Sequence, residues 1–155
     1  MNQNNKEKQE PDWFFGNYKK NKSTNFVISC DIFPYDVMVS VSQTNEELSK
    51  CLSNLGVEKD QYDSERGLEY KSFTSQGYAL MFPSGSCILR IRKMPYDPKD
   101  YGILSHEIFH IATFILNDCG IESNQHTEEV HAYLIGYLTE KILTKLDHAK
   151  RNRHI

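Results

Sequence analysis

Two histidines and a glutamate stand at a spacing that could bind and use a metal ion. The segment His106-Glu107-Ile108-Phe109-His110 has the form H-E-x-x-H. Residues four apart share one face of an α-helix, so the imidazoles of His106 and His110 could bind one Zn²⁺ together. Glu107 lies one step round the same helix, where its carboxylate could take a proton from an activated water molecule. We therefore expect a zinc site with His106 and His110 as ligands and Glu107 as general base.

A catalytic zinc site needs a third protein ligand, and the sequence offers four candidates shortly after the motif. These are His126, Glu128, Glu129 and His131. We expect Glu129, because on a helical wheel it shares a face with Ala132, Tyr133 and Gly136, and the two small residues would let the motif helix approach closely. Glu128 is the first alternative, and His131 also remains open.

Hydrolysis through such a site also needs a hydrogen-bond donor for the developing oxyanion. The candidates are His126, His131, Tyr101 and Tyr133. The sequence does not rank them.

The motif lies inside a segment with clear helix boundaries. Asp97 is a good N-cap, Pro98 suits the first helical position, and Gly120 is a typical C-terminal stop. The residues between them are apolar on nearly every face, which predicts a central buried helix. A final helix is expected from about Thr127 to Leu146.

Four short apolar segments before the motif predict a small β-sheet. FVISCDIF and VMVSVS flank a turn at Pro34-Tyr35-Asp36, and YALMF and CILRIRK flank a turn at 83–86, so each pair predicts a hairpin. Between the hairpins, Thr44 and Gly56 bound an amphipathic helix, and 57–76 is expected to be loop. The fold class is therefore α+β: a small, largely antiparallel sheet packed on the buried motif helix and the C-terminal helix.

Arginines alternate with isoleucines in the last predicted strand, which is typical of a half-exposed or edge strand. Arg90 and Arg92 are expected to be solvated charges, with selection of acidic substrate residues as the alternative.

The composition indicates a single globular domain without a cysteine-based metal site. The chain has 155 residues with 39% hydrophobic content, which suits one globular domain. Residues 1–12 are polar and expected to be a disordered tail, leaving a single domain over 13–155. The four cysteines form no CxxC pair, so a thiolate zinc site is not expected.

The charge balance and the absence of long apolar runs argue against nucleic acid and membranes as partners. The formal net charge of −3 gives no global attraction to nucleic acid, and the basic end around 150–154 is expected to be a solvated helix end. We find no signal peptide and no apolar stretch near membrane length. A cytoplasmic protein without membrane or nucleic-acid partners is therefore expected.

The motif and the later stretch Glu129-Val130-His131-Ala132 resemble the zincin-like metallopeptidases, specifically the gluzincin pattern of small bacterial and phage-type members. The resemblance covers 98 to about 146. It implies a minimal zincin-like fold that binds Zn²⁺ and hydrolyses peptide bonds in a peptide or protein substrate. It also implies that a strand upstream of the motif helix, here the segment 87–93, pairs with extended substrate.

The alternative is a non-catalytic, zincin-like metal-binding protein that acts as a phage or mobile-element structural or accessory component. The small size supports it, as does Tyr133 where many gluzincins carry Asp or Asn. Glu107 favours the enzyme, because a purely structural metal site needs no general base.

Overall fold

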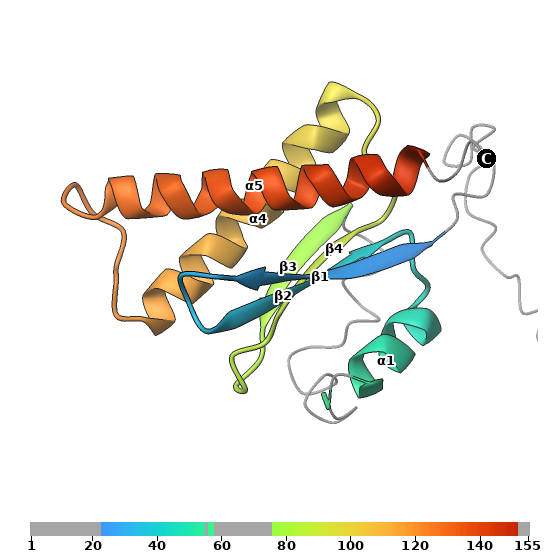
Figure 1. The fold of residues 1–155 in the computed structure, drawn as a ribbon, viewed down its shortest axis with the longest axis horizontal. Helices are drawn as coiled ribbons and strands as arrows, with labels where there is room; N and C mark the ends of the chain where they lie inside the picture. The colour runs from blue at the N-terminus through green and yellow to red at the C-terminus, as the bar shows by residue number, and fades with distance from the viewer. Residues whose placement is uncertain (1–22, 55, 58–75, 152–155) are drawn as a thin grey trace, which may run out of the picture.

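The computed structural model describes residues 23–54, 56–57 and 76–151. Within them a four-stranded sheet and three helices form an α+β fold, as predicted (Figure 1). In chain order the elements are β1 (Thr24–Cys30), β2 (Tyr35–Val41), α1 (Asn45–Asn54), β3 (Gly77–Met81), β4 (Cys87–Ile91), α4 (Pro98–Asp118) and α5 (Glu128–Arg151). The expected tail at 1–12 and nearly all of the expected loop at 57–76 lie outside the described residues.

The sheet has the strand order β1-β2-β4-β3. Both predicted hairpins are present, because β1 pairs with β2 and β3 pairs with β4 in antiparallel fashion. The two hairpins join through β2 and β4, which run parallel, with Val39 opposite Leu89. The sheet is therefore mixed rather than largely antiparallel. A parallel pair needs a long connection, and the chain from β2 to β4 supplies it, carrying α1 on the way.

This order corrects the expectation that the strand beginning at Cys87 is an edge strand. β4 is an inner strand, and all five of its residues are buried. Among the strands of the described residues, β1 and β3 are the edges. Arg90 is only 8% exposed and donates through Nη2 to the Gln43 carbonyl at 2.6 Å and through Nη1 to Asn45 Oδ1 at 2.9 Å. It therefore anchors the chain between β2 and α1, and it is not a solvated charge.

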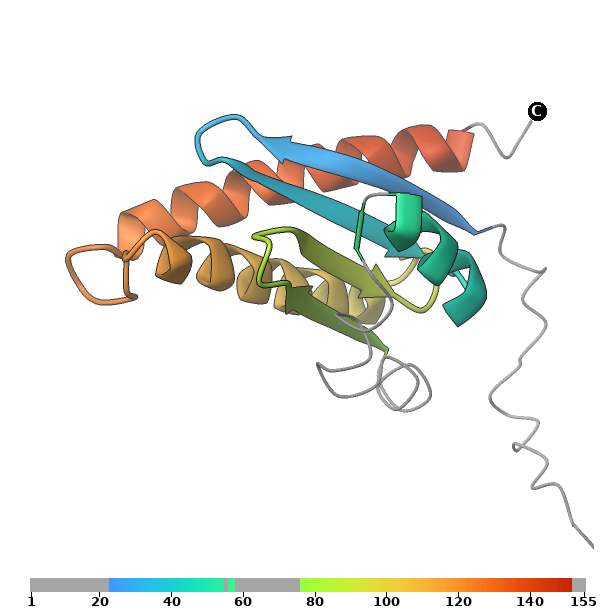
Figure 2. The ribbon, with the colours of Figure 1, turned by 90° about the horizontal axis from the view of Figure 1, so that it is seen from below.

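The helices cover both faces of the sheet. α4 and α5 lie on one face, and α1 lies on the other (Figure 2). Alternate strand residues divide between the two cores: Val39 and Leu89 pack with α4 and α5, whereas Met38 and Ile88 pack with α1. α4 packs against β3 and β4, while α5 packs against β1 and α4. The motif helix is thereby held next to the β3 edge.

The predicted boundaries of α4 are confirmed. Asp97 caps the helix in a capping box with Asp100, Pro98 is its first residue, and Gly120, at φ +76°, follows the C-cap. Its burial differs from the prediction. One face packs into the core, but the opposite face is open, with Phe109 49% exposed. The helix is therefore less buried than its apolar sequence predicts.

α5 begins at the predicted place and continues beyond Leu146 to Arg151. Its buried stripe consists of His131, Leu134, Leu138, Ile142 and Leu146. Near its end, Lys150 Nζ donates to the Tyr101 hydroxyl at 2.8 Å, which ties α5 to the first turns of α4. No helix in the described ranges combines the length and apolarity needed to cross a bilayer.

Candidate metal centre

His106 and His110 point their ring nitrogens at each other. The two Nε2 atoms are 3.0 Å apart, and the rings meet nearly edge to face, at 86°. In a tetrahedral zinc site with Zn–N bonds of 2.0–2.1 Å, two histidine nitrogens are about 3.3 Å apart. The pair therefore fits two ligands of one zinc ion with only a small adjustment. His106 is exposed and His110 is partly buried, so an ion can reach them from solvent.

The surroundings of His110 favour its neutral form. Burial lowers the pKa of this imidazole, and the nearby His106 lowers it further. A metal ion binds the neutral imidazole, so little proton competition is expected at this ring near neutral pH.

Glu107 lies one step round α4 from His106, on the side of the helix that faces β3. It is 6% exposed and lies against the backbone of β3. An ideal Cβ built on Gly77 would be 2.9 Å from Glu107 Cγ and 3.1 Å from Oε1. The carboxyl group thus lies between the motif helix and β3, and Glu107 directly follows His106 in the sequence.

Glu129, the predicted third ligand, lies exposed in the first turn of α5. The face that it shares with Ala132, Tyr133 and Gly136 is exposed as well, so it does not pack on α4 as expected. A Cβ on Gly136 would meet no atom within 4 Å. The buried stripe of α5 explains this position. Glu129 is two residues before the buried His131, so it is turned by about 200° from His131 around the helix and points away from the core.

The alternative ligands are not beside the pair either. Glu128 is exposed. His131 is 5% exposed, with Nδ1 3.0 Å from the Thr127 carbonyl oxygen and Nε2 buried without a hydrogen-bond partner in the described part of the chain. Over residues 23–54, 56–57 and 76–151, no three side chains of His, Cys, Asp or Glu gather closely enough to hold a metal ion. The structure thus brings together two of the proposed ligands.

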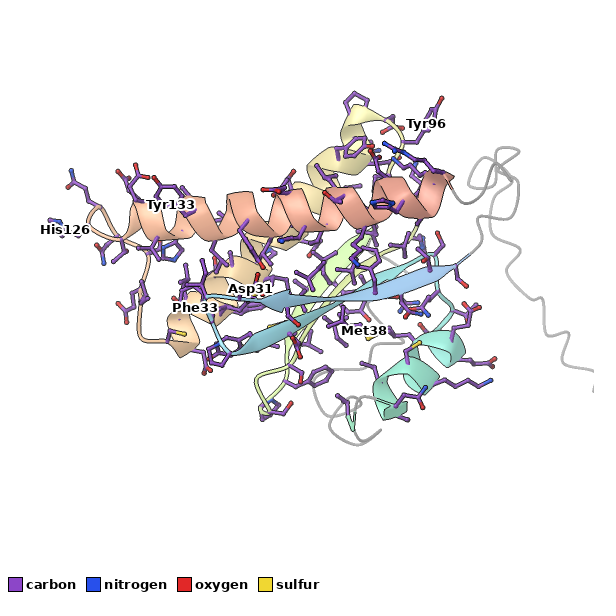
Figure 3. All side chains as sticks on the ribbon, viewed as in Figure 1. Asp31, Phe33, Met38, Tyr96, His126 and Tyr133 are labelled. Carbon is purple, nitrogen blue, oxygen red and sulfur yellow. The ribbon has the colours of Figure 1, made fainter. Side chains whose placement is uncertain are left out.

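The oxyanion candidates are dispersed. The Tyr101 hydroxyl accepts from Lys150, and His131 faces the core. His126 and Tyr133 lie at the N-terminal end of α5, outside the sheet, and Tyr133 is 76% exposed (Figure 3).

Gly77 contacts the motif helix in a way that the sequence does not predict. A lone glycine at the start of a strand carries little signal, because its importance depends on what the neighbouring helix presses against it. The contact with Glu107 depends on how β3 and α4 pack together.

Comparison with protein-family models, with characterised proteins and with solved structures finds no match for this chain.

Proposed function

We propose that this protein is a zinc-dependent metallopeptidase in which His106 and His110 are metal ligands and Glu107 is the general base. The observation that carries the proposal is the 3.0 Å approach of the two Nε2 atoms, one helical turn apart, on an H-E-x-x-H helix. Glu129 is the proposed third ligand, with Glu128 and His131 as alternatives.

A bound zinc ion would lower the pKa of water towards 7 and polarise the carbonyl of the scissile bond. Glu107 would take a proton from the attacking water at a carboxylate oxygen and deliver it to the leaving amine. Its burial supports this role, because a carboxylate shielded from bulk water interacts more strongly with charge that develops beside it.

The edge strand β3 is the proposed place for an extended peptide substrate. An edge strand presents unpaired backbone groups, and a peptide can add to them as a further strand. β3 is next to Glu107 through Gly77, whereas β4 is enclosed between β2 and β3. The substrate is therefore assigned to β3 in place of the segment 87–93.

Zinc content tests the metal site. The purified protein should bind one equivalent of zinc by elemental analysis, and His106→Ala and His110→Ala should each lose it. His148→Ala is the matched control, because this exposed histidine lies near the far end of α5. Glu129→Gln should weaken zinc binding roughly 10–100-fold or more if Glu129 is the third ligand. Zinc-free native protein would refute the proposal.

Cleavage of fluorescein-labelled casein tests the reaction. Glu107→Gln should keep its zinc and lose at least about a hundredfold in rate, as expected for a missing general base. If the zinc protein and Glu107→Gln are equally inactive, the alternative of a non-catalytic metal-binding accessory protein takes its place.

A further inference from the structure

Gly77 is the first residue of β3 and lies directly over the motif helix. A Cβ at this position would be 2.9 Å from Glu107 Cγ and 3.0 Å from Ile103 Cγ2. Ile103 and Glu107 are four residues apart on α4, so the bare backbone of Gly77 rests between two side chains on one face of the helix. Real Cβ atoms essentially never come within 3.0 Å of another heavy atom, so a larger residue here would force a shift.

The backbone conformation does not explain the glycine. The described glycines with positive φ are Gly56, Gly85 and Gly120, and Gly77 is not among them. An alanine could therefore adopt the same dihedral angles. The absence of a side chain at this position matters for space alone, and the space is taken by Glu107 and Ile103.

We infer that Gly77 is a positioning residue that fixes where the Glu107 carboxyl group can lie. The inference rests on the proposed role of Glu107 as general base. With no Cβ at Gly77, the glutamate side chain lies flat against the edge strand, where an added peptide would pass. A methyl group at that point pushes the carboxyl group away from the strand, and a base displaced by about 1 Å loses much of its effect.

Thermal unfolding tests the contact without any need for activity. Gly77→Ala should lower Tm by about 3–10 °C, the range that overpacking produces in a domain of this size. In a Glu107→Ala background the same substitution should lower Tm by less than half as much, because the two close contacts with Cγ and Oε1 of Glu107 are gone and only the one with Ile103 Cγ2 remains. Gly136→Ala is the matched control: it adds the same methyl group in open space on a helix and should raise Tm by about 2–4 °C.

Casein cleavage per zinc-loaded molecule tests the positioning role. Gly77→Ala should retain one zinc and an unchanged KM while kcat falls at least about tenfold. A merely structural residue would reduce the amount of folded, zinc-loaded protein and leave kcat per zinc unchanged. That result would overturn the inference, as would equal Tm losses in the two backgrounds.

If Gly77→Ala does not fold but the Gly77→Ala/Glu107→Ala double variant does, the contact is supported, and failure of both overturns it. If Glu107→Gln proves as active as the natural chain, the proposed function fails. The Tm comparison still decides whether Gly77 constrains Glu107.

Discussion

Asp100 holds the start of the motif helix, and its neutral substitute Asp100→Asn should destabilise the fold. The carboxylate is 5% exposed and pairs with Lys93 Nζ at 2.8 Å. Its Oδ2 also accepts from the backbone N–H groups of Tyr96 at 3.1 Å and Asp97 at 3.4 Å. Asparagine keeps the shape and one acceptor but loses the charge. The free energy of unfolding should fall by about 1.5–3 kcal/mol, the range for a hydrogen bond to a charged group.

The pH dependence of this loss identifies its cause. Burial raises the pKa of Asp100, but the hydrogen bonds from Lys93 and the amides of Tyr96 and Asp97 outweigh it, so the pKa lies below the ordinary 3.8. Because the folded-state pKa is below the unfolded value, ionisation stabilises the fold above pH 3.8, and this contribution is lost as the pH falls through the folded pKa. The difference between Asp100→Asn and the natural chain should be full at pH 7 and pH 5 and smaller at pH 3.

Urea denaturation at these three pH values measures the effect. Asp147→Asn is the control, since its 3.9 Å pair with Arg151 is exposed and should contribute less than about 0.5 kcal/mol. A loss below about 0.5 kcal/mol at pH 7 for Asp100→Asn, or a loss equally large at pH 3, would refute the reasoning.

Three other perturbations probe the parts of the fold around the site. Arg90→Met should lower the free energy of unfolding by about 2–4 kcal/mol in urea, because buried acceptors lose their donor, and a loss under 1 kcal/mol would contradict the anchoring role. Gly120→Ala should lower it by about 1–2 kcal/mol, since φ is +76°, and an unchanged midpoint would argue against this helix end. At pH 8 the exposed Cys119 should react quickly with a thiol reagent, while Cys87 and Cys30 react only on unfolding, because burial raises their pKa values to about 12 and about 11. Equal rates for all three in the native protein would contradict the burial.

Local signals predicted the elements well because local contacts form them. Thr44 caps α1 through its hydroxyl, which accepts from the Glu47 N–H, while the Glu47 carboxylate accepts from the Thr44 N–H. Both partners are within three residues of each other, so the pattern is readable in the chain. The same holds for the cap at Asp97 and the stop at Gly120.

The order of the strands was not predictable in the same way. The pairing of β2 with β4 joins residues about fifty positions apart, and nothing in either segment specifies the partner. Arg90 illustrates the consequence. An Ile-Arg alternation normally indicates a solvated face, but here the guanidinium group is satisfied by Gln43 and Asn45, which a different element supplies.

The proposed metal site is likewise only partly predictable from the sequence. The spacing of His106 and His110 is a property of one helix, and the structure brings their Nε2 atoms together without help from the rest of the chain. A third ligand depends on how two helices cross and on which face α5 turns outward. Because His131 belongs to the buried stripe of α5, Glu129 is exposed. If Glu129 is the third ligand, as proposed, zinc binding should draw the first turn of α5 towards the motif helix, because among the described residues no third ligand lies beside the two imidazoles.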